Sequence, residues 1–197
     1  GEIQTGRTKK KDLEMRDKLR ALGWDTETAS SIKDIYNGNI LIDATRGIVQ
    51  LAECIELVLD GFEQVMDGGP LAREPCFGIK VTLTDAKLHE DAIHRGPAQV
   101  YPAVREGIKL AIVNGGPILF EPVQTHVIEG PVESTGDMTK LVMNKRGQVL
   151  ELNQEGSLAI VKARMPVAEM IGWSSDLRSA TGGRGTSALA DQTFEKC

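Results

Sequence analysis

Residues 114–117 read Asn-Gly-Gly-Pro, and this short run constrains the fold more than any other feature of the chain. Glycine and proline beside asparagine end regular structure and favour a turn, and here they follow a helical pattern. A chain of 197 residues is long enough for one large domain or two small ones. The turn therefore predicts two units, residues 1–117 and 118–197. With 41% hydrophobic residues, both units can bury a core.

The first unit is predicted to mix helices with short strands. Apolar residues recur at helical spacing through residues 48–66, which indicates a strong amphipathic helix. Residues 77–83 alternate between apolar and polar side chains, as a half-buried strand does. The further predicted elements are a helix from Leu13 that Gly23 closes, a helix from Asp25 or Thr26 to Tyr36, a strand or an ordered entry to the next helix at 40–42, and a helix at 102–113 that Pro102 opens.

The second unit is predicted to follow the order β-α-β-β-α-β, which is the split ferredoxin-like arrangement. This topology supports many functions and does not specify one. The predicted elements are a strand at 119–128, a helix opened by Pro131 and followed by Gly147, strands at 148–152 and 158–165 joined by a loop at 153–157, a helix capped by Ser174, and a strand at 186–194. The fold class is thus α/β, of the α+β kind.

The net charge of the chain limits the kinds of molecule that it is expected to bind. The formal net charge is −5, so the chain lacks the basic excess of proteins that bind bare duplex nucleic acid, and any RNA contact has to be local. Lys9-Lys10-Lys11 is interpreted as a solvated approach to a surface helix rather than a phosphate site. No apolar run approaches a membrane span and no signal-peptide pattern is present. A start at Gly1 without methionine is expected of a fragment or a tagged chain.

The cysteines indicate the compartment. Cys54, Cys76 and Cys197 are odd in number and lack paired spacing. This fits a reducing environment and excludes a disulfide framework.

The stretch LHEDAIHRG at residues 88–96 holds two of the three histidines. It superficially resembles the zinc-protease motif His-Glu-x-x-His, whose histidines lie about 40° apart around a helix. His89 and His94 are five residues apart, which would separate them by about 140° on a helix, so both rings would not reach one ion from one face. The stretch is therefore predicted to be a loop without metal. It either contacts RNA through an exposed imidazole and Arg95, or forms a structural corner in which His89 and Asp91 bond to the backbone and Arg95 is exposed.

No other motif predicts catalysis in this chain. The phosphate-binding pattern Gly-x-x-x-x-Gly-Lys-Ser/Thr is absent, and the glycine-rich run 182–187 is interpreted as a turn between a helix and a strand. The nucleophile elbow Gly-x-Ser-x-Gly is also absent. His126 lies in an alternating strand pattern and is predicted to point to solvent. We therefore expect no catalytic residue and no metal ligand in this chain.

Long segments of the chain resemble a known family. The segment DAKLHEDAIHRGPAQVYPAVR, residues 85–105, strongly resembles the tip of domain IV of archaeal and eukaryotic elongation factor 2, a family of translational GTPases, and HRGPAQ is archaeal in character. The bacterial counterpart, elongation factor G, lacks the histidine loop. Other matching segments are LGWD (22–25), NILIDATRGIVQLAE (39–53), GPLAREP (69–75), FEPV (120–123), NKRGQVLE (144–151), KARMPVAEMIGW (162–173) and LRSATGGRG (177–185).

The resemblance implies a fold for each unit. Residues 1–117 would be domain IV, related to domain 2 of ribosomal protein S5, with its tip at 88–97. Residues 118–197 would be the ferredoxin-like domain V. The GTP-binding domain, an early strand of domain IV with a Ser-Pro-Asn-Lys loop, and the C-terminal tail of the family have no counterpart here, so the first sheet is expected to have an unpaired edge.

The resemblance also implies a function. The full-length factor would drive GTP-dependent translocation of tRNA and mRNA, using GTP and magnesium in its N-terminal domain, while this part needs no cofactor. His94 would be the residue converted to diphthamide by dedicated enzymes and ADP-ribosylated by diphtheria-type toxins. The tip would contact rRNA of the small-subunit decoding region and the mRNA–tRNA duplex through His89, Asp91, His94, Arg95 and Gly96. The protein would be a cytoplasmic monomer on the ribosome, away from membranes.

Two other functions compete with this one. The chain could be a metal-dependent hydrolase that uses His89, Glu90, Asp91 and His94, or a non-ribosomal RNA-binding protein that reuses the S5-like scaffold. The factor hypothesis expects His94 to be exposed to solvent at the end of an elongated domain. A buried ring would contradict it.

Overall fold

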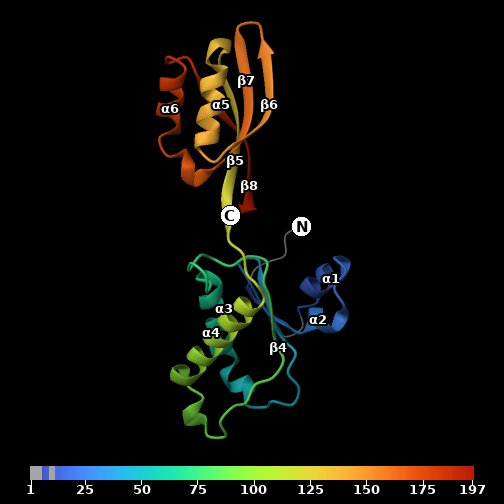
Figure 1. Ribbon diagram of the computed structural model, residues 1–197. Helices are drawn as coiled ribbons and strands as arrows, with labels where there is room; N and C mark the ends of the chain where they lie inside the picture. Colours follow the sequence, from blue (N-terminus) through green and yellow to red (C-terminus); the bar gives the residue numbers. More distant parts are fainter. Residues whose placement is uncertain (1–5, 9–11) are drawn as a thin grey trace. The chain divides into compact units, whose positions relative to one another are not determined.

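The computed structural model describes residues 6–8 and 12–197, and the three consecutive lysines lie outside the described residues. The chain is a mixed α/β protein with two four-stranded sheets, and it divides into two compact units, residues 1–117 and 118–197 (Figure 1). Each unit holds its own sheet and its own buried apolar clusters.

The sheet of the first unit has the strand order β1-β2-β3-β4. β1 (Gly6–Arg7), β2 (Ile32–Tyr36) and β3 (Asn39–Asp43) pair antiparallel, whereas β4 (Lys80–Leu83) runs parallel to β3. A parallel pair needs a long crossover, and here the crossover contains helix α3 (Leu51–Asp67). Because successive strand residues face opposite sides, Leu41 packs with α3 while Ile42 joins a separate cluster on the other face.

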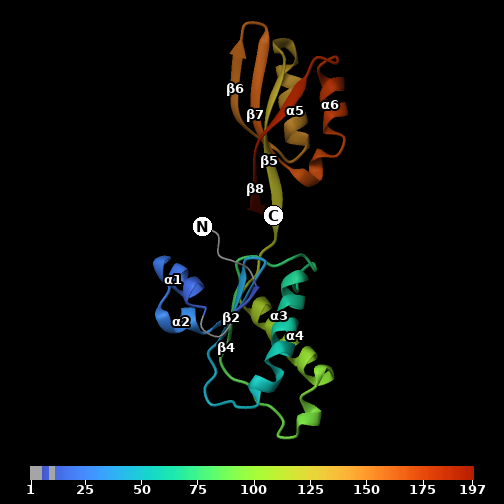
Figure 2. The same ribbon diagram turned by 180° about the vertical axis from the view of Figure 1, so that it is seen from behind.

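Helices cover both faces of this sheet. α3 and α4 (Pro97–Asn114) lie on one side, and the short helices α1 (Leu13–Ala21) and α2 (Thr26–Ser30) lie on the other, as both views show (Figures 1 and 2). Gly61 permits the close approach of α3 to α4, since a Cβ at this position would lie 2.9 Å from the Val104 Cγ1. The cluster under α3 and α4 consists of Leu41, Leu51, Cys54, Val58, Leu59, Phe62, Val65, Met66, Val100 and Ile108.

Three sequence-based boundaries in the first unit are wrong. The helix predicted for 26–36 stops at Ser30, and Ile32 begins strand β2. The β-branched side chains at Ile32 and Ile35 are buried against α1 and α2, and this tertiary contact prevails over a weak helical pattern. The α4 helix begins at Pro97, five residues before Pro102, because Gly96 adopts the extended N-cap conformation and Pro97 takes the first position. The strand predicted for 77–83 begins only at Lys80.

The second unit has the predicted β-α-β-β-α-β order. Its sheet is entirely antiparallel, with the strand order β6-β7-β5-β8. α5 and α6 lie together on one face of it (Figures 1 and 2). The elements are β5 (Phe120–Pro131), α5 (Thr135–Asn144), β6 (Gln148–Glu155), β7 (Leu158–Pro166), α6 (Trp173–Ala180) and β8 (Thr186–Lys196). The buried cluster between helices and sheet consists of Ile128, Met138, Val142, Ala159, Val161, Ala163, Met165, Trp173 and Leu177.

Local details of the second unit differ from the sequence-based expectation. The loop between β6 and β7 spans two residues, not five, because both strands continue to pair up to Glu155 and Leu158. Arg146, two residues past the end of α5, has a left-handed φ of 50°. Gly147 is needed for packing, since a Cβ there would lie 2.5 Å from the Met165 Cγ. Gly172, rather than Ser174, occupies the N-cap of α6.

Candidate functional site: the histidine loop between β4 and α4

The histidine loop, residues 84–96, connects the end of β4 to the start of α4 (Figure 1, green). Its centre is a single 3₁₀ turn at Ala92–His94. The Asp91 carboxylate accepts a hydrogen bond from the Ile93 N–H at 3.1 Å and so caps this turn. The prediction that LHEDAIHRG is a loop after a strand is therefore confirmed.

The two histidines of the loop are in direct contact. The ring centroids of His89 and His94 are 4.5 Å apart at an interplanar angle of 67°, which is an edge-to-face arrangement. The 140° separation expected on a helix does not apply here, because the segment forms a 3₁₀ turn within a loop and not a helix. Proximity alone does not create a metal site here. Within the described parts of the chain, no group of three or more histidine, cysteine, aspartate or glutamate side chains could hold a metal ion.

A hydrogen bond from the backbone determines the tautomer of the neutral His89 ring. Its Nδ1 accepts a hydrogen bond from the Asp91 N–H at 3.0 Å, so the neutral ring carries its proton on Nε2. In this tautomer neither nitrogen of His89 offers a lone pair to a ligand. This geometry disfavours the hydrolase that the sequence allowed, in which His89, Glu90, Asp91 and His94 would bind a metal.

His94 is exposed to solvent, as predicted, and so are His89 and Asp91. The neighbouring Ile93 is 75% exposed, which places an apolar side chain beside the His94 imidazole. Gly96 is half-buried and has an ordinary φ of −82°. The loop thus presents two imidazoles, a carboxylate and an isoleucine together on a short, capped turn.

Arg95 does not occupy the predicted position. Both interpretations of the loop expected an exposed guanidinium, but the Arg95 side chain is only 8% exposed. It forms an ion pair with Glu53 in the first turn of α3, and its Nη1 donates to the carbonyl oxygens of His89 at 2.8 Å and Glu90 at 2.7 Å. No local pattern of residues pointed to Glu53 as the partner, because that residue lies 42 positions away. Arg95 thus connects the backbone of the loop to helix α3.

His126 is also placed differently from the prediction. The ring is buried rather than turned to solvent. Its Nδ1 lies 2.9 Å from the Ser187 hydroxyl and its Nε2 lies 3.1 Å from the Gln124 amide oxygen. The Trp173 indole N–H donates to the same hydroxyl at 3.0 Å. A neutral ring that accepts at Nδ1 and donates at Nε2 satisfies this network. Burial correspondingly lowers the pKa of His126. His126 is therefore a structural residue of the second unit.

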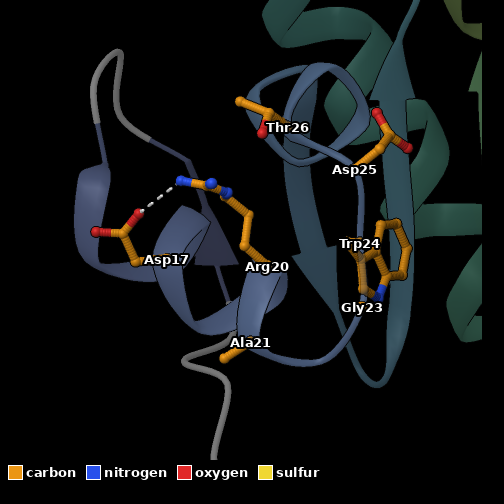
Figure 3. A pocket seen from close by; sticks show the side chains of 7 residues that line it. All are labelled: Asp17, Arg20, Ala21, Gly23, Trp24, Asp25 and Thr26. Carbon is orange, nitrogen blue, oxygen red and sulfur yellow. Dashed lines mark ion pairs between the residues drawn. The ribbon is translucent and has the colours of Figure 1, made fainter.

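A shallow pocket lies between α1 and α2 and contains none of the predicted site residues (Figure 3). The side chain of Arg20 points toward Asp17, and their charged atoms are 3.9 Å apart. The carboxylate of Asp25 caps α2 by accepting from the Thr28 N–H at 2.8 Å, and this hydrogen bond lowers its pKa. The charged side chains that line the pocket, Asp17, Arg20 and Asp25, thus have partners within α1 and α2. The lining residues are Asp17, Arg20, Ala21, Gly23, Trp24, Asp25 and Thr26.

The glycine-rich run and the three cysteines lie outside the histidine loop. The run 182–187 connects α6 to β8, so its interpretation as a helix-to-strand turn is confirmed. Cys54, Cys76 and Cys197 are all free thiols, and burial raises the pKa of Cys54 and of Cys76. Within the described residues, no helix is long and apolar enough to cross a membrane.

Comparison with protein families places this loop in context. Residues 1–116 match the family model described as elongation factor G, domain IV, and residues 118–197 match the model described as elongation factor G C-terminus. The chain belongs to the elongation factor G family. The two matched ranges meet at residue 117, which is the last residue of the first compact unit.

Archaeal members of this family are similar to the chain over nearly its whole length. Elongation factor 2 of Nanoarchaeum equitans is 50% identical over 195 residues, which cover 99% of this chain and 26% of that protein. Elongation factor 2 of Methanocaldococcus jannaschii is 47% identical over 197 residues, covering 100% of this chain and 27% of the relative. The Thermococcus onnurineus protein is 47% identical over 184 residues, or 93% of this chain and 25% of its own length. The chain therefore spans about a quarter of the length of these curated relatives.

Proposed function

We propose that this chain is the C-terminal part of an archaeal elongation factor 2 and that its histidine loop enters the decoding region of the small ribosomal subunit during translocation. The observation that carries the proposal is the exposed His94 on a capped turn, within a chain that aligns almost end to end with proteins named elongation factor 2. The full-length protein would be a cytoplasmic GTPase that binds GTP and magnesium in its N-terminal domain. It would act as a monomer on the ribosome.

The charges of the loop support a specific role for His94. Glu90 and Asp91 lie next to the histidines, and the one guanidinium of the loop is paired with Glu53. Beside the histidines, carboxylates therefore outnumber unpaired cations, and an added cation would strengthen the attraction of this part of the loop to RNA phosphates. Conversion of His94 to diphthamide, by dedicated enzymes, would add a quaternary ammonium group at the exposed position. The same exposure makes His94 accessible to an ADP-ribosylating toxin of the diphtheria type.

The other loop residues would act around His94. His89 and Asp91 are exposed and would contact rRNA or the mRNA–tRNA duplex. Gly96 has no side chain, so its backbone can approach RNA closely. Arg95 would contact RNA only by exchanging the Glu53 carboxylate for a phosphate, whose charge it could equally neutralise.

The decisive experiment is to purify the protein from its native cells and to measure the mass of the peptide that contains His94. We expect a mass increase that corresponds to diphthamide, located on His94 by fragmentation. His89 is the matched internal control, because it is an exposed imidazole of the same loop and should remain unmodified. An unmodified His94, or equal modification of both rings, would contradict the proposed role of the loop.

Ribosome binding tests the remaining part of the proposal. The 197-residue chain should co-sediment with small ribosomal subunits from an archaeon, and His94→Ala should weaken this association. His126→Asn is the control substitution, since His126 is buried in the second unit. An equal effect of both substitutions would show that the loop has no specific part in binding.

A further inference from the structure

The guanidinium of Arg95 contacts three acceptors, two of them in the histidine loop and one in α3. Its Nη1 donates to two successive carbonyl oxygens, those of His89 and Glu90, and its Nη2 pairs with the Glu53 carboxylate. The two carbonyls belong to the first half of the loop, whereas Arg95 itself follows the 3₁₀ turn. The side chain therefore closes the loop across its base, and the closed loop is the one in which the rings of His89 and His94 meet.

Glu53 connects this closed loop to a rigid element. It lies in the first turn of α3, between residues that anchor the helix in the core: Leu51 is 4% exposed and Cys54 is 1% exposed. The glutamate side chain itself is 57% exposed, so it reaches out of the core toward the loop. A helix fixed by its buried face makes a better reference point than a second loop would, because few of its backbone dihedral angles remain free.

The negative charge of Glu53 compensates the positive charge of the largely buried Arg95 guanidinium. Arg95 is 8% exposed, and its Nε has no hydrogen-bond acceptor among the described residues. A guanidinium removed from water in this way is costly unless an anion compensates it. Two neutral carbonyl oxygens compensate the charge only in part. Without Glu53, we expect Arg95 to turn outward to solvent and to release both carbonyls of the loop.

We infer that Glu53 is a positioning residue for His94: through Arg95 it holds the histidine loop in the conformation that presents the His94 imidazole. This inference rests on the proposed function of the loop only for its consequence, which is efficient modification of His94. The conformational part stands on the ion pair, the two carbonyl contacts and the contact between the rings.

The first test uses Glu53→Gln in the full 197-residue chain, with Glu106→Gln as the matched control. Both substitutions remove one carboxylate from an exposed position on a helix, and the Glu106 side chain pairs only with Lys109 in the same helix among the residues described. We expect the amide protons of Ile93, His94 and Arg95 to exchange about tenfold faster in Glu53→Gln, since a hydrogen bond to a charged group contributes at this level. The nuclear Overhauser effect between the His89 and His94 ring protons should disappear. Glu106→Gln should change neither.

A double-mutant cycle shows whether Glu53 acts through Arg95. Arg95→Lys replaces the planar fork by a single ammonium group that cannot serve three acceptors in the same geometry. If Glu53 acts only through Arg95, the loop amide protons of the double variant Glu53→Gln/Arg95→Lys should exchange no faster than those of the more affected single variant. Additive effects of the two substitutions would overturn the inference, as would an intact ring contact in Glu53→Gln.

The second test measures modification of His94 when each variant is expressed in an archaeal host that makes diphthamide. We expect the modified fraction of Glu53→Gln to fall severalfold below that of the unchanged chain and of Glu106→Gln. Full modification of Glu53→Gln would contradict its positioning role even if its loop exchanges faster. If the unchanged chain is itself unmodified, the proposed function fails, while the exchange and ring-contact measurements still decide the role of Glu53.

Discussion

The two units differ in how they accommodate a buried ionisable residue. In the first unit the Asp34 side chain is fully buried in strand β2, and neither carboxylate oxygen has a hydrogen-bond partner among the described residues. In the second unit the buried His126 has partners for both ring nitrogens. The comparison shows that burial alone does not determine the cost of a polar side chain, because a completed network removes most of that cost.

The two groups consequently respond to pH in opposite directions. Burial, and after it the proximity of the Glu63 carboxylate, raise the pKa of Asp34 to about 6, although the Arg7 guanidinium opposes the shift. Burial lowers the pKa of His126. In both cases the neutral form is favoured in the folded protein. The first unit should therefore be more stable in mild acid, and the second should be more stable at neutral pH.

The comparison is meaningful only if the units unfold separately, and core truncation tests this with the largest expected effect. Phe62 is fully buried under α4, so Phe62→Ala should destabilise the first unit by about 4 kcal/mol. Trp24 and Trp173 are the two tryptophans of the chain, one in each unit. Urea unfolding monitored by fluorescence should show a large shift for Trp24, measured in a Trp173→Phe background, and none for Trp173, measured in a Trp24→Phe background.

Val161→Ala provides the reciprocal control. Val161 is fully buried in the second unit, and its truncation should move only the Trp173 transition. Equal shifts of both transitions in either variant would mean that the chain unfolds as one body. The pH contrast would then have to be measured on the whole chain rather than unit by unit.

The pH dependence of Asp34 is the next largest effect. A folded-state pKa above the unfolded value of about 4 means that the folded protein binds the extra proton, so stability from this group is lost as pH rises from about 4 through about 6. We expect the first unit to lose roughly 1 to 2 kcal/mol over this window. Asp34→Asn, which is neutral and of equal size, should abolish the loss and should be more stable than the unchanged chain at pH 8.

The exposed Asp17 provides the control for that experiment, because its side chain is 67% exposed. Asp17→Asn should leave the pH profile of the Trp24 transition unchanged. A flat profile in the chain without substitutions would show that Asp34 is ionised in the folded protein at little cost. The contrast with His126 would then disappear.

The smallest of these effects is expected at His126. Its folded-state pKa lies below the ordinary value of 6.5, so the unfolded chain takes up a proton first as pH falls, and the second unit loses stability from pH 6.5 downward. A loss of stability toward pH 5 should therefore appear in the Trp173 transition. His126→Asn retains an acceptor for the Ser187 hydroxyl and cannot titrate, so its profile should be flat in this range. A gain of stability toward pH 5 in the unchanged chain would reverse the assignment.

Much of the fold could be predicted because its signals are local. The apolar stripe of 48–66 and the strand–helix order of the second unit repeat within a few residues, and short-range repeats determine which face of an element is buried. Residues 26–36 show where this reasoning fails. Their short pattern was compatible with a helix, and pairing of Ile32–Tyr36 with β3 decided in favour of a strand.

The candidate site was predicted in location but not in geometry. The residue pattern predicts a loop at 88–96, because polar residues and glycine follow an alternating strand, whereas the exposure of His94 is an expectation of the family resemblance. Only the tertiary structure brought His89 against His94, turned Arg95 inward to Glu53, and buried His126 beside Ser187. The partners in the last two contacts are 42 and 61 residues apart. Contacts over such distances arise from chain packing, and no local pattern of residues encodes them.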